Sequence, residues 1–266
     1  MSTVEAPAKK RAQISARTLR TDNWRSYPIF IVVLFTTWVA YATVRAMMGK
    51  YYWVDEYNYL TPFYSPCVST ECVPGSAHFG TFLPELPFFI PFAAVSLPFL
   101  LLFRLTCYYY RKAYYRSYWR SPAACAVREP HKKYTGERRF PLVAQNLHRY
   151  FWAAAVIISI INTYDALLAF TDSNGDFRMG LGSLILLGNV ILLWGYTLSC
   201  HSCRHIVGGR LKNFSKHPLR YRAWTLVSKL NERHGQYALI TLGSLVVADL
   251  YVALVSGGVI SDPRII

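Results

Sequence analysis

The chain has 266 residues, of which 53% are hydrophobic and 16% aromatic, and its formal net charge is +15. The apolar residues come in blocks about as long as a bilayer is thick, whereas a soluble domain would disperse them at helix or strand period, so the composition argues against a soluble protein. A basic excess can indicate nucleic-acid binding in a soluble protein, but in a membrane protein the placement of the charge matters more, and we expect no nucleic-acid partner.

Five apolar stretches are long enough to cross the membrane. Roughly 20 apolar residues in a helix span the ~30 Å hydrocarbon layer. The stretches are about Pro28–Met48, Leu83–Leu105, Tyr150–Phe170, Leu181–Ser199 and Tyr237–Gly257. We therefore predict an all-α polytopic membrane protein, with a five-helix transmembrane bundle over residues 28–258 and an outer tail over residues 259–266.

Residues 1–27 form a polar, basic segment rather than a cleavable signal, because no small-residue cleavage site follows the first apolar block. This segment carries six of the 29 Lys and Arg residues, residues 104–149 carry eleven, and residues 200–236 carry eight. The positive-inside rule places these basic segments in the cytoplasm. The prediction is thus a multi-pass plasma-membrane protein with its N-terminus inside and its C-terminus outside.

The first outer loop contains Cys67 and Cys72, in the stretch Tyr-Ser-Pro-Cys-Val-Ser-Thr-Glu-Cys-Val-Pro-Gly. The oxidising side of the membrane favours a disulfide between them, which would close a small turn. Two free surface thiols are the alternative. The other four cysteines lie on the reducing side, where we expect thiols or metal ligands.

Two long inner loops, residues 107–147 and 201–233, are rich in Tyr, Trp, Arg and Lys. Such residues suit an anionic lipid interface, and they also suit a docking surface for a cytoplasmic partner. Because two such loops lie on one side, we expect them to bind a peripheral subunit. Part of their surface should also contact lipid.

His and Cys residues gather at the inner ends of the last three predicted spans. His148 opens the third span, His234 opens the fifth, and the fourth ends in Cys200-His201-Ser202-Cys203-Arg204-His205. At about 100° per residue, Cys200 and Cys203 share one face of the fourth helix, more than 90° from His201 and His205. Helical phase therefore predicts that the inward-facing set is Cys200, Cys203, His148 and His234.

Two thiols and two imidazoles in one buried layer suit a metal centre, since thiolates are soft ligands and imidazole binds zinc and iron alike. Two Cys and two His are the ligand set of a Rieske-type [2Fe–2S] cluster, which is our preferred interpretation. Only Cys203-x-His205 matches half of the soluble Rieske spacing. If the fourth helix ends before Cys200, His201 and His205 compete for the His role, and Cys107 can replace one thiol.

Two further interpretations of this layer remain open. A single haem b could lie between His148 and His234 on facing helices. The layer could instead be structural, or contact a quinone directly.

Two acids, Asp165 and Asp249, fall within the apolar stretches, in their outer halves. Intramembrane acids are candidates for proton transfer or for binding a polar ligand, and headgroup-level capping is the alternative. They also allow a second hypothesis, a transporter or channel, although no internal repeat supports it.

Several motifs resemble those of the membrane-anchor (cytochrome b-like) subunit of actinobacterial succinate dehydrogenases, the succinate:menaquinone oxidoreductases. They run from Phe-Tyr-Ser-Pro-Cys through Phe-Arg-Leu-Thr-Cys-Tyr-Tyr-Tyr-Arg-Lys-Ala-Tyr-Tyr-Arg, Glu-Pro-His-Lys-Lys-Tyr-Thr-Gly-Glu, Asn-Leu-His-Arg-Tyr-Phe, Thr-Tyr-Asp-Ala, Cys-His-Ser-Cys-Arg-His with Gly-Gly-Arg-Leu, and Ser-Lys-Leu-Asn-Glu-Arg-His. Together they extend from the first span to the last.

The resemblance implies an anchor that holds a flavoprotein subunit and an iron–sulfur subunit on the cytoplasmic face, and it allows another small membrane subunit beside it. Electrons from succinate would pass through FAD and clusters in those partners and reach menaquinone in the bilayer, with the succinate site on another chain. Candidate quinone-binding residues at the inner interface are Trp24, Tyr108, Arg111 and Tyr115, because quinones need flat apolar contacts and a few hydrogen-bond donors. A second quinone site near Asp165 and Asp249 is a weaker hypothesis.

Overall fold

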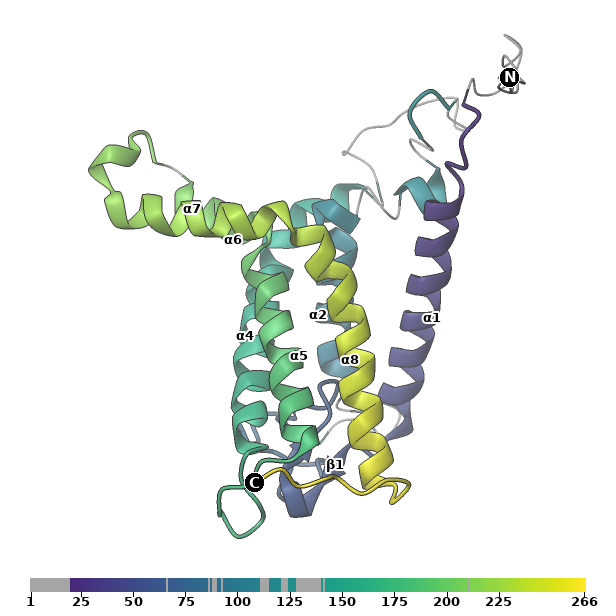
Figure 1. Ribbon diagram of the computed structural model, residues 1–266, viewed down its shortest axis with the longest axis vertical. Helices are drawn as coiled ribbons and strands as arrows, with labels where there is room; N and C mark the ends of the chain where they lie inside the picture. The colour runs from purple at the N-terminus through teal and green to yellow at the C-terminus, as the bar shows by residue number, and fades with distance from the viewer. Residues whose placement is uncertain are drawn as a thin grey trace, which may run out of the picture.

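The protein is described here by a computed structural model that covers residues 20–65, 67–85, 87, 90–91, 93–110, 115–120, 124–127, 140, 142–209 and 211–266. Its frame consists of four long apolar helices that run side by side (Figure 1). They are α1 (Ser26–Met48), α4 (His148–Leu168), α5 (Leu181–Leu198) and α8 (His234–Ser256). In length and hydropathy, four segments of the described chain could cross a membrane, namely these helices, with α4 taken from Val143.

Helix α2 (Ala93–Thr106) stands where the predicted span at residues 83–105 was expected, but it has only 14 residues. Such a helix is about 21 Å long, shorter than the hydrocarbon layer. The described residues before it form turns and bridges, with Leu83 paired to Ser69. Prolines explain the late start, because Pro87 and Pro91 remove amide donors and disfavour helix at the preceding residues. The structure therefore supports four spans by length, and α2 as a shorter helix within the bundle.

The remaining elements are short. Strands β1 (Trp53–Val54) and β2 (Tyr59–Leu60) form an antiparallel hairpin, with Trp53 opposite Leu60. The helical turns and shorter helices are η1 (Asp55–Tyr57), η2 (Tyr115–Trp119), η4 (Leu142–Leu147), α6 (His201–Gly208), η5 (Phe214–Lys216) and α7 (Pro218–Glu232).

Helices α6 and α7 form an arm that projects sideways from the end of the bundle where α4 and α8 begin (Figure 1). We call this the Cys/His end, and the opposite end, which carries β1 and β2, the hairpin end. The arm is tied together by contacts between its two helices. Arg204 Nε donates to Ser228 Oγ at 3.0 Å, and Arg220 donates to the carbonyl of Val207 at 2.9 Å. Arg204 also lies 4.9 Å from the centroid of the Trp224 ring.

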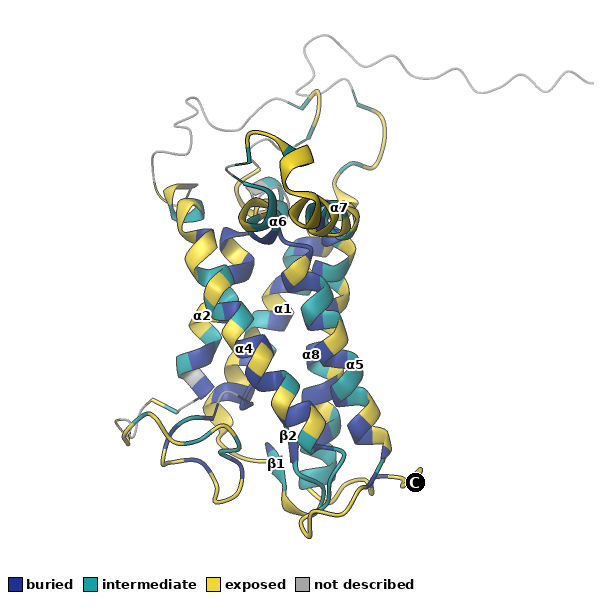
Figure 2. Cartoon of the chain, turned by 90° about the vertical axis from the view of Figure 1, so that its left-hand side faces the viewer, coloured by how far each residue is buried: buried dark blue, intermediate teal, exposed yellow. Residues whose placement is uncertain are grey.

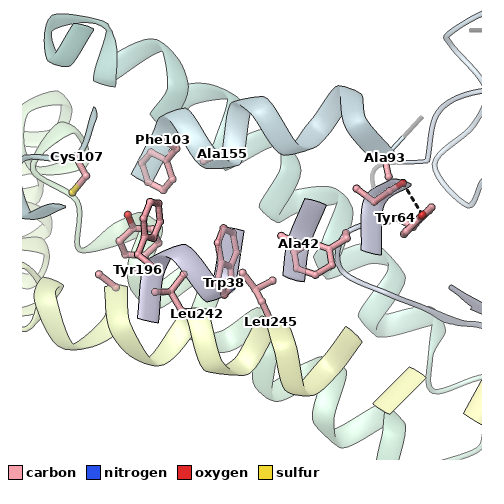
Figure 3. Close-up of a cluster of buried hydrophobic side chains, with 14 of the residues drawn as sticks. Trp38, Ala42, Tyr64, Ala93, Phe103, Cys107, Ala155, Tyr196, Leu242 and Leu245 are labelled. Atoms are coloured by element: carbon pink, nitrogen blue, oxygen red, sulfur yellow. Dashed lines mark hydrogen bonds between the residues drawn. The ribbon is translucent and has the colours of Figure 1, made fainter. Parts of the chain in front are cut away.

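Figure 2 shows that the helices of the bundle bury one side and expose the other. The core is aromatic and includes Trp38, Phe63, Phe103 and Tyr196, all at most 5% exposed; part of it appears in Figure 3. The outward side chains that are more than half exposed include Ile29, Val33, Val44, Ile157, Leu167, Ile191 and Val247. Apolar side chains facing outward along whole helices are what a lipid environment requires.

The hairpin end is closed by a disulfide and by a buried ionic cluster. Cys67 and Cys72 are joined in the structure, where the sequence favoured such a bond. Asp262, near the C-terminus, accepts hydrogen bonds from Arg178 Nη2 at 2.8 Å and from the Tyr59 hydroxyl at 2.9 Å. Burial opposes ionisation of Asp262, but the hydrogen bonds from Tyr251, the Gly182 amide, Tyr59 and Arg178 together hold the pKa of this carboxyl below its usual range.

Two glycines of α5 give a matched test of the helix packing. A methyl group added at Gly195 would meet the Tyr237 ring of α8 at 2.9 Å, whereas one added at Gly188 would meet nothing within 4 Å. We expect Gly195→Ala to destabilise the protein by about 1–3 kcal/mol through overpacking. Gly188→Ala should be neutral or stabilising by up to about 1 kcal/mol, because alanine is the better helix former. Thermal unfolding of both purified variants measures the difference, and equal melting temperatures would contradict the close α5–α8 contact.

Candidate functional site

Two thiol–imidazole pairs lie at the Cys/His end of the bundle. Cys200 Sγ is 3.0 Å from His148 Nε2, and Cys107 Sγ is 3.2 Å from His234 Nε2. The histidines are the first residues of α4 and α8, Cys107 directly follows α2, and Cys200 is the N-cap of α6. All four side chains are buried, at 1–8% exposure. Four separate helices therefore deliver two thiols and two imidazoles to one layer, which we call the Cys/His site.

Hydroxyl groups orient both imidazoles. Thr106 Oγ1 lies 3.0 Å from His148 Nδ1, and Ser199 Oγ lies 2.7 Å from His234 Nδ1. Each ring thus uses Nδ1 for a structural hydrogen bond and turns Nε2 toward a sulfur. Such outer contacts fix ring orientation and tautomer in metal sites.

An aromatic ring stacks on each of these imidazoles. The ring centroids of Phe103 and His148 are 5.2 Å apart with an interplanar angle of 6°, and those of Tyr196 and His234 are 5.0 Å apart with an angle of 14°. Phe103, Tyr196 and Cys107 appear together at one end of the cluster in Figure 3. The imidazoles are therefore fixed by stacking as well as by hydrogen bonds, which is the preorganisation a ligand site needs.

The thiols are protonated at neutral pH when nothing binds them. Burial, reinforced by the neighbouring Cys107, raises the pKa of the Cys200 thiol to about 12. Burial also raises the pKa of Cys107, opposed by the backbone amides of Tyr110 and Tyr109, by the Tyr196 hydroxyl and by the charge of Arg104. Such thiols are poor nucleophiles, since the thiolate is the reactive form. Binding a metal would release their protons, because ligating sulfur is deprotonated.

The four side chains line one cavity of about 770 Å³. The other residues that line it are Tyr108, Tyr109, His201, Asn231, Glu232, Gly235, Gln236 and Leu239. A second cavity, of about 1120 Å³, lies alongside between α4 and the arm. Three residues, Tyr108, His148 and His201, line both cavities. The Cys/His site therefore adjoins enough space for a cofactor or for a flat organic ligand.

The donor set suits a soft metal or an iron–sulfur cluster, because thiolate sulfur and imidazole nitrogen are what these centres bind. Across the described ranges, no three His, Cys, Asp or Glu side chains are already arranged around one metal position. The donors instead stand as two pairs that open onto the same cavity. The four side chains therefore fit a soft metal or an iron–sulfur cluster, both in their donor atoms and in their position on one cavity.

Three of the residues predicted from the sequence, His148, His234 and Cys200, lie together in this site. The fourth residue of the site is Cys107, where helical phase had predicted Cys203. Cys107 faces His234, and Cys203 does not line the cavity. Helical phase failed there because α5 ends at Leu198, so Cys203 belongs to a new helix with a different axis. Its neighbour His205 lines the second cavity instead. Cys107 was the alternative thiol predicted from the sequence, and its signal is its place just after the second apolar block.

Of the four residues suggested for quinone binding, Tyr108 lies at the cavities. It lines both and is 70% exposed. Trp24 precedes α1, with Arg25 over its ring at 5.3 Å, and lines neither cavity. Tyr115 begins η2, and Arg111 lies outside the described residues.

Both intramembrane acids are bound to partners toward the hairpin end. Asp249 accepts hydrogen bonds from Arg45 Nε and from the Tyr41 hydroxyl, each at 2.6 Å, which joins α8 to α1. Asp165 Oδ1 is 2.9 Å from His78 Nδ1, which joins α4 to the loop after β2. Each carboxylate connects two segments that are distant in sequence, and each is at most 4% exposed.

Long apolar helices, buried polar contacts between them and a Cys/His site at one end define a helical membrane protein with a candidate cofactor centre. The sequence model for the actinobacterial succinate dehydrogenase subunit SdhC matches residues 26–258, and the chain belongs to this family. It is thus a subunit of a succinate dehydrogenase complex, which confirms the resemblance seen in the sequence and removes the transporter hypothesis.

One solved structure supports the same conclusion. A chain of the Mycobacterium smegmatis Sdh1 complex in the apo form is 65% identical to this chain, with a TM-score of 0.90 and 98% of each chain covered. No curated protein sequence matches the chain.

Proposed function

We propose that this subunit anchors the flavoprotein and iron–sulfur subunits to the membrane and conveys their electrons to menaquinone through a centre held at the Cys/His site. The observation that carries this proposal is the pairing of Cys107 with His234 and of Cys200 with His148 on one cavity at the end of the bundle. A purely structural anchor has no need for two buried thiols aimed at two preoriented imidazoles.

The Cys/His end faces the cytoplasm in this proposal. Arginines are abundant there and in the arm, whereas Arg45 and Arg178, nearer the hairpin end, are both bound to carboxylates. The basic residues of the Cys/His end include Arg104, Arg149, Arg204, Arg220, Arg222 and Arg233. By the positive-inside rule, the disulfide then lies outside and the basic loops meet the partner subunits and anionic lipid. We take α2 as the fifth crossing of this topology, which puts the N-terminus on the cytoplasmic side.

A Rieske-type [2Fe–2S] cluster suits the site better than haem b. Each imidazole Nε2 faces a thiol, and the two thiol–imidazole pairs supply the two sulfur and two nitrogen ligands of such a cluster. A haem held between His148 and His234 would leave both thiols without a role. When bound, the cluster would supply one-electron transfer chemistry. Within the chain, Thr106 and Ser199 orient the nitrogen ligands.

The overall reaction balances across the complex. Oxidation of succinate to fumarate on the partner subunits releases two electrons and two protons, and menaquinone takes up two of each to become menaquinol. We place the quinone in the cavities that Tyr108 and His148 share, because a flat ring can lie there beside the Cys/His site. Asp165 and Asp249 are bound to His78 and Arg45, contacts that favour a structural role over a second quinone site.

Spectra of the purified complex test the proposal. A rhombic paramagnetic resonance signal of low average g, additional to those of the partner's clusters, is expected after reduction, with iron and sulfide in matching excess. A reduced haem α band, or iron that the partner subunits account for completely, would contradict the cluster. The first of these results would favour the haem-bearing anchor instead.

A further inference from the structure

The larger cavity, between α4 and the arm, has a basic wall. Arg149, the second residue of α4, and Arg220, in the first turn of α7, line it from two different helices. None of the described residues that line this cavity is acidic, and no carboxylate of the described chain forms an ion pair with either arginine. A hollow with two permanent cations and no acid attracts an anionic ligand.

The wall also keeps hydrogen-bond donors for such a ligand. Arg220 donates through Nε and Nη2 to three backbone carbonyls at the end of α6, at 2.9–3.2 Å, and no described residue accepts from its Nη1. The guanidinium of Arg149 lies 5.2 Å from the centroid of the Tyr150 ring and likewise donates to no described residue. Gln145 lines the same cavity, and its buried Nε2 has no acceptor among the described residues. Because a buried donor without an acceptor is costly, Gln145 independently indicates a ligand with oxygen atoms.

The apolar side of the cavity continues into the lipid-facing surface of α4. Tyr150, Trp152 and Ala153 line the cavity, and tyrosine and tryptophan are typical of the membrane interface. From Ala153 onward, exposed residues recur three and four positions apart, which places them on one face of the helix. This α4 stripe consists of Ala153, Ile157, Ile160, Tyr164 and Leu167. At about 1.5 Å per residue the stripe is about 21 Å long, more than half of the ~30 Å hydrocarbon layer.

We propose that this cavity binds the headgroup of an anionic glycerophospholipid. Arg149 and Arg220 hold the phosphate, Gln145 donates to a phosphate or ester oxygen, and one acyl chain lies along the α4 stripe. Arginine suits this role because its guanidinium presents several donors to a phosphate. A small soluble anion would use the arginines but leave the apolar side of the cavity uncovered.

The bound lipid would join α4 to the arm, since its phosphate contacts one arginine from each. It occupies the part of the cavity toward the arm and leaves the edge lined by Tyr108 and His148 to the quinone ring. The inference does not depend on which group the Cys/His site holds.

A lipid titration of the purified complex tests the site. Complex depleted of lipid in detergent is titrated with phosphatidylglycerol or with zwitterionic phosphatidylcholine, and native mass spectrometry measures the bound lipid. We expect phosphatidylglycerol to bind more tightly, and Arg149→Gln to raise its Kd about fivefold, the effect of one basic side chain on an anionic lipid. Arg222→Gln is the matched control, because it removes the same charge from an exposed position of α7 that does not line the cavity. It should change the Kd by less than about twofold, since solvent and salt screen a charge that does not contact the phosphate.

Crosslinking locates the bound lipid. Phosphatidylglycerol with a photoactivatable group in one acyl chain should label the α4 peptide that contains Ile157 and Ile160, and should label it less in Arg149→Gln. Equal Kd values for the two lipids, an unchanged Kd in Arg149→Gln, or labelling confined to other helices would overturn the inference. Arg220→Gln should weaken binding as well, but because Arg220 also closes the end of α6, Arg149→Gln decides if that variant fails to assemble. The proposed function can fail without changing these results, because neither the Kd nor the labelling depends on a cluster.

Discussion

Replacing Cys107 with serine is expected to abolish the additional iron–sulfur signal of the complex, whereas replacing Cys203 with serine should leave it intact. Cys107 contacts His234 and lines the cavity, while Cys203 is buried in the first turn of α6 and lines neither cavity. A serine hydroxyl at position 107 can still bond to His234, so the fold should persist. A serine hydroxyl is a poor ligand for iron, so we expect the cluster to be lost.

The measurement is the iron content of the complex, together with its resonance spectrum. We expect Cys107→Ser and Cys200→Ser to lose about two iron atoms per complex, the content of a [2Fe–2S] cluster, and quinone reduction to fall by more than tenfold. Cys203→Ser controls for the loss of a buried thiol. The assignment is wrong if Cys203→Ser loses the iron and Cys107→Ser retains it, because the helical phase of α5 would then continue through Cys203.

The second large effect concerns the buried ion pair between α1 and α8. Asp249→Ala leaves the guanidinium of Arg45 buried without its carboxylate partner, and removing one member of a buried pair typically costs about 3–5 kcal/mol. Asp249 is fully buried and also accepts a hydrogen bond from the Tyr41 hydroxyl, so three donor groups on Arg45 and Tyr41 lose their acceptor together. We expect a large fall in the thermal stability of the purified complex and poor retention of this subunit.

Two further variants make that prediction specific. Asp176→Ala removes an exposed carboxylate in the loop after α4 and should change stability by less than about 0.5 kcal/mol. The double variant Arg45→Met with Asp249→Leu replaces the pair by apolar side chains, and it should recover most of the lost stability. A double variant as unstable as Asp249→Ala would show that volume or shape, rather than the unpaired charge, causes the loss.

The sequence predicted most of the bundle because apolar length is a direct physical requirement of a span. It did not predict the short α2, because hydropathy does not register prolines that remove backbone donors before Ala93. The residues that bind Asp165 and Asp249 could not be predicted from the sequence either. The Arg45–Asp249 pair spans more than 200 positions, and the His78–Asp165 contact depends on how the loop after β2 folds.

The candidate site, too, could be predicted from the sequence only in part. His148 and His234 could be predicted as ligand candidates because each opens a helix at the same end of the bundle. The choice between Cys203 and Cys107 depended on whether α5 continues past Leu198, a boundary that residue spacing does not determine. The roles of Thr106, Ser199 and Tyr196 around the imidazoles arise only from packing.

The position of Cys200 has a consequence for biogenesis. This residue is the N-cap of α6, and its sulfur accepts the Ser202 amide at 3.4 Å, so the arm begins at a thiol of the site. Maturation of the site and folding of the arm consequently share a starting point. Under the proposed function, a newly inserted polypeptide whose arm has not formed would also lack a seated Cys200. Such a chain would offer its partners neither the arm nor a finished site, so docking would follow completion of both.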